Sequence, residues 1–108
     1  MYGNELIIDL KNCSNINRKS LRLFVIKLCK EIGMKRYGKC QVVYFGKGKF
    51  RGYSLFQFIT TSSITGHFTD KDAYINIFSC LDFNKDKVGN FVKNWFKTNE
   101  VKTIFNRR

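Results

Sequence analysis

Hydroxyl, imidazole and thiol groups gather in one short stretch of this sequence. Ser62 and His67 lie five residues apart, and His67 is the only histidine of the chain. Cys80 ends the next apolar segment, and Ser54 precedes Ser62 by eight residues. Such side chains can converge where adjacent antiparallel strands meet, and together they can supply a nucleophile and a proton carrier. By spacing alone, however, hydroxyl-rich strands, a structural histidine and a packed cysteine are the commoner explanation.

The bulk composition predicts one compact domain over residues 1–108. The hydrophobic share is 44%, which is enough for a packed core, and eleven Phe make it unusually aromatic. No apolar run in the sequence is long enough to cross a membrane. The first residues show neither a basic leader nor a long apolar stretch, so we expect a cytoplasmic protein.

The four cysteines do not suggest a metal site or disulfides. None of them pairs as CxxC, and a zinc site would need an all-cysteine arrangement from scattered positions. Disulfides are rare in a reducing compartment. We therefore expect at least three buried or half-buried thiols, with Cys80 as the exception.

The charge is the most unusual bulk property. Twenty Lys and Arg against eight Asp and Glu give a net charge of +12. A surface of this kind attracts polyanions, so nucleic acid is a candidate partner. A soluble, self-repelling surface in a Lys- and Asn-rich proteome is the simpler explanation, and we favour it.

Hydrophobic periodicity predicts two amphipathic helices and six short strands. Apolar residues recur at helical spacing from Leu21 to Ile32 and from Val88 to Phe96, with Gly33 as a stop for the first helix. The basic, glycine-broken stretch 46–49 reads as a hairpin turn, because it lacks the Gly-Lys-Ser/Thr ending of a phosphate loop. Strands are predicted at residues 5–10, 40–45, 53–61, 63–68, 73–78 and 101–105.

This order of elements predicts an α+β fold, a two-layer α/β sandwich. Two helices most simply lie on one face of an antiparallel sheet. Along residues 73–78, side chains alternate between the two faces: Ile75 and Ile77 point to one face, and Tyr74, Asn76 and Phe78 point to the other. In the preceding strand, Gly66 permits a bend or bulge. The sheet's second face stays open and invites a partner subunit.

The stretch from Ile59 to Cys80 resembles the core of the short, bacterial-type S-adenosylmethionine decarboxylases. That family has Glu-Ser-His at its processing serine, a histidine five positions after that serine, and an apolar strand that ends in Phe-Thr/Ser-Cys. Ser62, His67 and Cys80 keep this register, Ser54 supports it, and the similarity spans nearly the whole chain.

The resemblance implies a pyruvoyl-dependent carboxy-lyase in polyamine (spermidine) biosynthesis. Ser62 would attack the preceding carbonyl, the chain would be cut between Thr61 and Ser62, and Ser62 would become the pyruvoyl group. Ser54 and His67 would assist processing, His67 by proton transfer. The pyruvoyl would act as electron sink for loss of carbon dioxide from S-adenosylmethionine, and Cys80 would return a proton to the substrate carbon.

The substrate is a sulfonium cation that carries adenine, so aromatic faces suit both of its parts. Phe45, Phe50, Tyr53 and Phe68 are the candidates for binding it. Family members form dimers with shared active sites, so we expect a homo-oligomer that pairs the open sheet faces. Metal ions, membranes and other cofactors are not implied.

The sequence departs from the family pattern around the processing serine. Thr61 replaces the glutamate before the serine, Ser63 replaces the histidine after it, and Glu5 stands where a histidine is usual in the otherwise similar first strand, residues 6–10 with Cys13. These departures leave alternatives open: an unprocessed homologue that degrades S-adenosylmethionine as a lyase, a pyruvoyl decarboxylase of ornithine or arginine, or a basic nucleic-acid-binding module without catalysis.

Overall fold

The computed structural model describes residues 3–108, apart from the side chain of Phe50. Within this range the chain forms six strands, two α-helices and one short 3₁₀ turn. Both helices fall where the periodicity predicts them, and all six predicted strands are present. The elements are β1 (Asn4–Lys11), α1 (Arg18–Glu31), β2 (Arg36–Phe45), η1 (Gly48–Phe50), β3 (Gly52–Ile59), β4 (Ser62–Phe68), β5 (Ala73–Ser79), α2 (Lys85–Phe96) and β6 (Glu100–Arg107).

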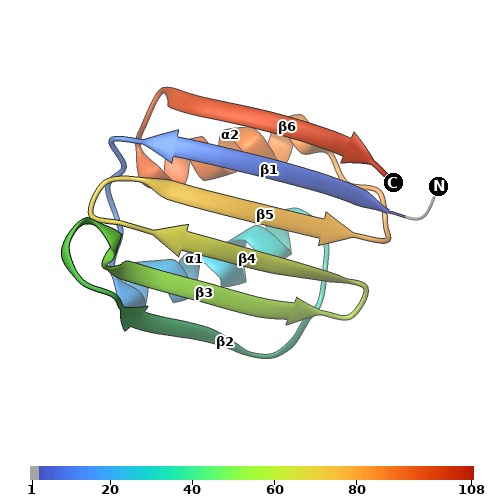
Figure 1. Ribbon diagram of the computed structural model, residues 1–108. Helices are drawn as coiled ribbons and strands as arrows, with labels where there is room; N and C mark the ends of the chain where they lie inside the picture. The colour runs from blue at the N-terminus through green and yellow to red at the C-terminus, as the bar shows by residue number, and fades with distance from the viewer. Residues whose placement is uncertain (1–2) are drawn as a thin grey trace.

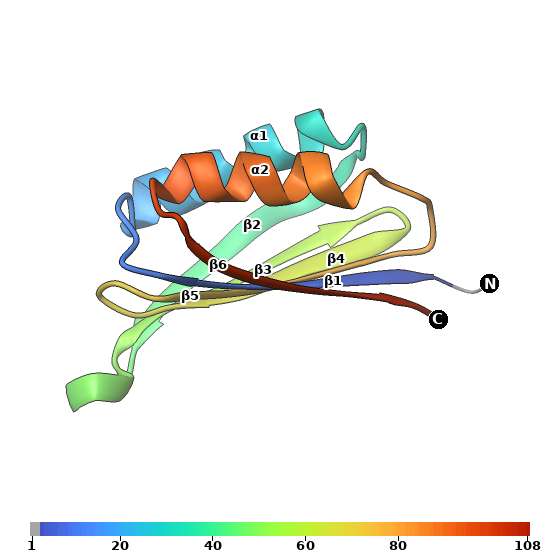
Figure 2. The same cartoon turned by 90° about the horizontal axis from the view of Figure 1, so that it is seen from above.

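The strands make one antiparallel sheet in the order β2-β3-β4-β5-β1-β6 (Figure 1). Both helices lie on the same face of this sheet, and the other face carries no layer of its own (Figure 2). α1 packs against β2 and β3, and α2 against β1 and β6. The predicted two-layer α+β sandwich is therefore confirmed.

The core lies between the helices and the inner face of the sheet. Along β1, Leu6, Ile8 and Leu10 are fully buried, as the alternation of a strand with one covered face requires. Phe24 of α1 meets them from the helix layer and packs against Phe96 of α2, with ring centroids 5.0 Å apart. Each helix supplies one apolar stripe to this core, which is why two helices suffice to cover it.

Local capping explains where the helices begin and end. Asn17 precedes α1, and its side-chain oxygen accepts a hydrogen bond from the Ser20 amide at 2.9 Å. Asn84 caps α2 in the same way, and Gly33 follows α1 with a φ of +67°, a conformation that glycine adopts without cost. Within residues 3–108, neither helix has the length and hydropathy to span a membrane.

Strand β2 begins earlier than the sequence pattern predicts. The expected strand started at Cys40, whereas β2 starts at Arg36 and is irregular between Tyr37 and Gln41. The buried side chain of Gln57 supports the irregularity, because its amide donates hydrogen bonds to the carbonyls of Tyr37 and Gly38 at 3.3 and 3.1 Å. A polar residue on the inner face of β3 thus replaces the missing ladder bonds.

Gly66 makes neither the bend nor the bulge that the sequence suggested. It pairs in regular register with Leu55 of β3 and Ile75 of β5. A Cβ atom at this position would lie 2.6 Å from the ring of Phe68, which is fully buried. The glycine is needed for space next to this ring, and not for an unusual backbone conformation.

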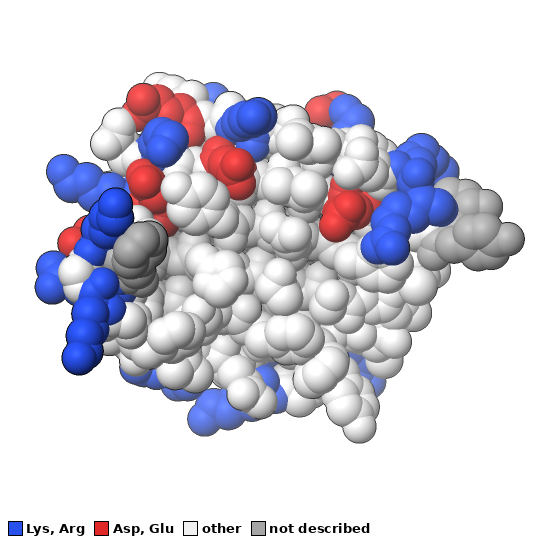
Figure 3. All heavy atoms as spheres, in the orientation of Figure 1, with Lys and Arg blue, Asp and Glu red and all other residues white. Residues whose placement is uncertain are grey.

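Uncharged side chains occupy the middle of the open face (Figure 3). One row across the sheet joins Phe56, Thr65, Asn76, Ile7 and Ile104, each paired in register with the next. Phe56 and Ile104 are exposed. The expectation that this face of the sheet stays open is met (Figure 2).

Candidate active site

Ser54 and His67 lie side by side on the open face of the sheet. They are direct cross-strand partners in β3 and β4, and Ser54 Oγ lies 2.9 Å from His67 Nδ1 in hydrogen-bonding contact. His67 is exposed, and its second ring nitrogen is not engaged by this contact. A hydroxyl that fixes one ring nitrogen orients the other, so this pair is suited to moving a proton at the open face.

Ser62 and Cys80 meet at the opposite end of the strands, where β4 begins and β5 ends. The main-chain amide of Cys80 donates a hydrogen bond to the carbonyl oxygen of Thr61 at 3.1 Å. Ser62 is half-buried on the helix side, and its hydroxyl donates to the sulfur of Met34 at 3.6 Å. The Thr61–Ser62 bond therefore sits next to the backbone of the exposed Cys80.

The structure does not bring the serine, histidine and thiol together within one chain, so the expected convergence of all three is wrong for a single copy. Ser62 and His67 are separated by five residues of a strand, which is roughly 17 Å. They also point to opposite faces, because side chains alternate along a strand. One chain thus carries two separate pairs: Ser54 and His67 are in side-chain contact, whereas Ser62 and Cys80 are brought together only through the bond from the Cys80 amide to the Thr61 carbonyl.

Two buried polar residues that the sequence did not single out hold the Cys80 segment in place. The amide of Asn4 donates to the Leu81 carbonyl at 3.2 Å and to the Asp82 carboxylate at 3.0 Å. The hydroxyl of Ser79 accepts from the Leu81 amide at 2.9 Å. Asn4 and Ser79 are both buried, so their hydrogen bonds are specific constraints. A polar residue at the first inward position of an apolar strand, as at Asn4, was the available signal.

The cysteines divide as the sequence predicts. Cys29 and Cys40 are buried, Cys13 is half-buried and Cys80 is exposed. Burial raises the pKa of Cys29 to about 11, and burial with the nearby carboxylate of Asp72 raises the pKa of Cys13 to about 11. Burial also raises the pKa of Cys40. These three thiols stay protonated and unreactive at neutral pH.

Two adjoining hollows on the open face surround the Ser54–His67 pair. They measure about 320 and 130 Å³, and Phe45, Ser54 and His67 line both. The exposed ring of Phe45 is well placed for a ligand. Tyr53 borders the smaller hollow, but it pairs in register with Phe68, and its ring lies on the helix side beneath Arg18.

Phe68, one of the four aromatic candidates, does not join this site. The ring of Phe68 belongs to the core, where it is 1% exposed and packs on Phe96, so it is not available to a ligand. It points inward because Phe68 follows the exposed His67 by one position in β4. The side chain of Phe50 lies outside the described part of the structure.

A larger groove lies elsewhere, between the outer surfaces of the two helices. It measures about 760 Å³ and is lined by residues such as Glu31, Asn90 and Trp95, none of which belongs to either reactive pair. Reactive side chains locate an active site better than size does, so we place the candidate site on the sheet. Among residues 3–108, no three His, Cys, Asp or Glu side chains gather as metal ligands.

Comparisons with known proteins identify the family and the fold. A family model described as S-adenosylmethionine decarboxylase matches residues 4–108. The crystal structure of the adenosylmethionine decarboxylase from Aquifex aeolicus VF5 has the same fold, with a TM-score of 0.82 and 14% sequence identity over 99% of this chain and 90% of that chain. No curated protein sequence matches significantly. Because the family model covers nearly the whole chain, the chain belongs to the S-adenosylmethionine decarboxylase family.

Proposed function

We propose that the chain is a lyase that removes the carboxyl group of S-adenosylmethionine, using a pyruvoyl group that forms from its own Ser62. The observation that carries this proposal is the hydrogen bond of 3.1 Å from the Cys80 amide to the Thr61 carbonyl oxygen. When a serine attacks the carbonyl before it, negative charge develops on that oxygen, and a fixed N–H donor stabilises such charge. Membership of the family supports the choice of substrate.

Formation of the pyruvoyl group begins with the chain itself. Ser62 Oγ bonds to the Thr61 carbonyl carbon while the amide C–N bond breaks, which leaves an ester and a free amine. Loss of the Ser62 α-proton then expels the Thr61 carboxylate and cuts the chain. Hydrolysis of the remaining dehydroalanine releases ammonia and leaves the pyruvoyl. When present, this group withdraws electrons from the substrate carbon that loses carbon dioxide.

The residues around Ser62 fit such a group. Ser62 is the first residue of β4 and pairs with Ile59 of β3 and Ser79 of β5, so the new chain end would stay anchored on both sides after the cut. The amide of Cys80 would remain beside that end. The exposed Cys80 thiol would then donate the proton to the substrate carbon.

A second copy of the chain would supply the proton-transfer pair. Within one chain His67 lies roughly 17 Å from Ser62 and on the other face of the sheet. If two open faces meet around a twofold axis, each copy can present Ser54 and His67 to the open-face side of the partner's Thr61–Ser62 bond. The Ser62 hydroxyl, which points to the helix side here, must then turn toward this bond to react. The uncharged middle of the open face favours such burial (Figure 3). The dimer would then carry two shared sites.

The substrate would lie in the hollows around Ser54 and His67. Phe45 and Phe56 line the larger one with apolar surface, and both are exposed enough to contact a ligand. Aromatic rings suit adenine by stacking and the sulfonium by cation–π attraction. This choice keeps only Phe45 from the residues predicted by sequence and adds Phe56, because the ring of Tyr53 lies on the helix side beneath Arg18.

Intact-mass spectrometry of freshly purified protein tests the proposal. Self-processing predicts two fragments, residues 1–61 and residues 62–108, with the second carrying a pyruvoyl in place of its amino-terminal serine. Ser62→Ala should give one uncut chain, and Ser63→Ala is the matched control that should still be cut. A wild-type preparation that remains a single chain while consuming S-adenosylmethionine would refute the pyruvoyl mechanism.

One observation favours a second function. Thr61 places a hydroxyl 3.3 Å from Ser62 Oγ, where the family has a carboxylate, and the Ser62 hydroxyl also contacts Met34 in the helix layer. A chain that keeps the substrate site without cutting itself could cleave S-adenosylmethionine in another way. Once oriented, the substrate's own carboxylate can attack its γ-carbon and break the C–S bond, which yields methylthioadenosine and homoserine lactone. Chromatography of the products separates the two functions, since decarboxylation releases carbon dioxide and yields no methylthioadenosine.

A further inference from the structure

The positive charge of this protein is concentrated in one part of the chain. Residues 10–69 contain twelve of the twenty Lys and Arg but only one of the eight Asp and Glu, a net charge of +11. All other residues together carry a net charge of +1. A composition that is simply rich in lysine would raise the positive charge throughout the chain. Because almost all of the net charge lies in residues 10–69, it requires an explanation specific to that segment.

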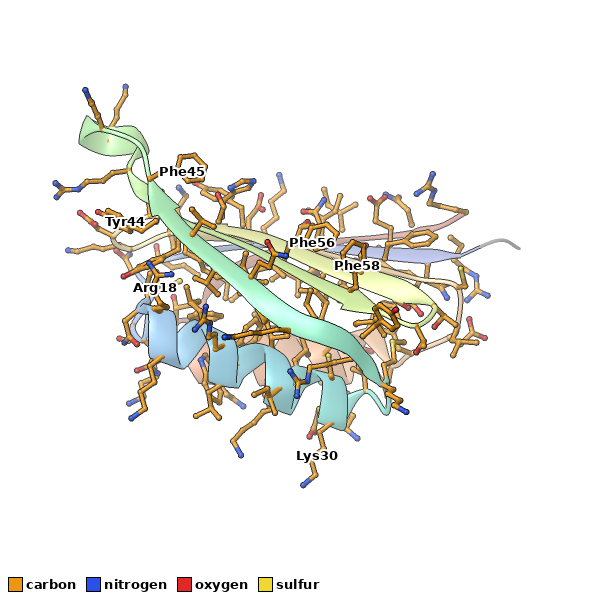
Figure 4. The ribbon with its side chains drawn as sticks, turned by 90° about the horizontal axis from the view of Figure 1, so that it is seen from below. Arg18, Lys30, Tyr44, Phe45, Phe56 and Phe58 are labelled. Atoms are coloured by element: carbon orange, nitrogen blue, oxygen red, sulfur yellow. The ribbon has the colours of Figure 1, made fainter. Side chains whose placement is uncertain are left out.

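The fold gathers most of this charge on one side of the molecule. α1 lies beneath the edge strand β2, and the two elements with their connecting turn carry eight basic residues (Figure 4). We call these eight the basic side. Among the described residues none of the eight forms an ion pair with a carboxylate. They are Arg18, Lys19, Arg22, Lys27, Lys30, Lys35, Arg36 and Lys39.

A hollow on the basic side offers a place for an anionic group. It measures about 390 Å³ and lies between α1 and β2, where Arg22 and Lys39 contribute to its lining. The Nε of Arg22 is buried there and has no hydrogen-bond partner among the described residues. An unpaired guanidinium nitrogen next to a lysine is suited to a phosphate oxygen.

Exposed aromatic rings flank the same side. Tyr37 is 68% exposed and Tyr44 is 46% exposed, and they lie toward the two ends of β2. Figure 4 shows Tyr44 at the hairpin end of β2, near Arg18 at the start of α1. Rings of this kind stack on unpaired bases without regard to sequence. Tyr44 pairs with Tyr53 on the helix side of the sheet, so it and α1 stay uncovered when open sheet faces pair. Tyr37 pairs with Phe58 at the edge of the open face.

We propose that the basic side binds single-stranded nucleic acid, with phosphates on the Lys and Arg side chains and unpaired bases on the tyrosine rings. When Lys and Arg side chains neutralise phosphates, the counterions that were condensed on the nucleic acid are released, and this release drives binding at low salt. The aromatic rings distinguish this ligand from other polyanions. The proposal does not depend on how the chain handles S-adenosylmethionine.

The test is a fluorescence anisotropy titration of the intact protein with a labelled oligouridylate at several salt concentrations. We expect the logarithm of the association constant to fall linearly with the logarithm of the salt concentration. The slope should be about −0.7 for each phosphate that the protein contacts. The variant with Lys19, Lys30 and Lys39 changed to Gln should weaken binding about tenfold or more. The control variant with Lys71, Lys93 and Lys97 changed to Gln removes the same charge elsewhere and should have little effect.

Tyr44→Leu separates nucleic acid from polyanions in general. It should weaken oligouridylate binding and leave the binding of inorganic polyphosphate unchanged. The proposal is overturned if the oligouridylate does not bind at low salt, or if both lysine triples weaken it equally. Equal binding of a duplex of the same length, or binding of phosphatidylserine vesicles in place of the oligouridylate, would also overturn it. Circular dichroism of each variant verifies that the fold is retained.

Discussion

The main-chain amide of Cys80 donates its hydrogen bond to the carbonyl oxygen of Thr61, at 3.1 Å. These residues are distant in sequence but face each other because β4 and β5 are paired through Ser62 and Ser79. The carbonyl of Thr61 is the group that a processing serine attacks. In the proposed function one residue would therefore serve two steps, its amide during self-processing and its thiol during decarboxylation.

Two substitutions at Cys80 separate these roles. Cys80→Ala keeps the amide, so we expect the chain to be cut at the normal rate but to lose decarboxylation. Cys80→Pro removes the N–H, and loss of one such donor costs about 10²–10³ in rate, so cutting should become very slow. The time course of fragment formation on a denaturing gel measures both. If Cys80→Pro is folded and cut as fast as Cys80→Ala, the amide has no part in processing.

The elements of the fold were accessible from the sequence because they depend on local patterns. The alternation at Ile75 and Ile77 and the apolar stripe from Leu21 to Ile32 each specify an element with one buried face. The early start of β2 was not accessible, because it depends on Gln57, a residue of another strand that supports the irregular backbone. Contacts between distant residues leave no periodic signal.

The site could have been predicted better than it was. A spacing of five along a strand places Ser62 and His67 on opposite faces, so the sequence alone argued against their convergence. Ser54 faces His67 because a two-residue turn joins Ile59 to Ser62, which sets the register of the hairpin. The position of Asn4 in an apolar strand marks it as unusual, but the sequence does not reveal its partners, which follow β5 and are distant in the chain.

Two glycine-to-alanine substitutions should have opposite effects on stability. At Gly66 the new Cβ would lie 2.6 Å from the buried ring of Phe68, and such overpacking costs about 1–3 kcal/mol. At Gly89 in α2 no atom lies within 4 Å of the new Cβ, and alanine favours a helix by up to about 1 kcal/mol. Urea denaturation of both variants measures the free energy of unfolding. A stable Gly66→Ala variant would contradict the packing described for this strand.

Alkaline pH should destabilise the protein through Cys29. Burial raises the pKa of this thiol from 9.0 to about 11, so the folded chain keeps a proton that the unfolded chain releases. The resulting stability is fully present below pH 9 and is lost as the pH rises toward 11, by up to about 2 kcal/mol. Cys29→Ala should lose less stability than the wild type over this range. If the free energy of unfolding falls in parallel with pH for the two proteins, the Cys29 thiol does not contribute to the loss of stability at alkaline pH.

Mixed oligomers test whether two chains share one site. Ser62→Ala cannot be cut and His67→Ala lacks the proton carrier, so each variant alone should remain intact. When the two are co-expressed with different tags, a shared site joins Ser62 of one chain to His67 of the other. We then expect mass spectrometry to find only the His67→Ala chain cut, in the fraction that carries both tags. If neither chain is cut in that fraction, processing takes place within a single chain, and the roughly 17 Å between Ser62 and His67 must close by a rearrangement of β4.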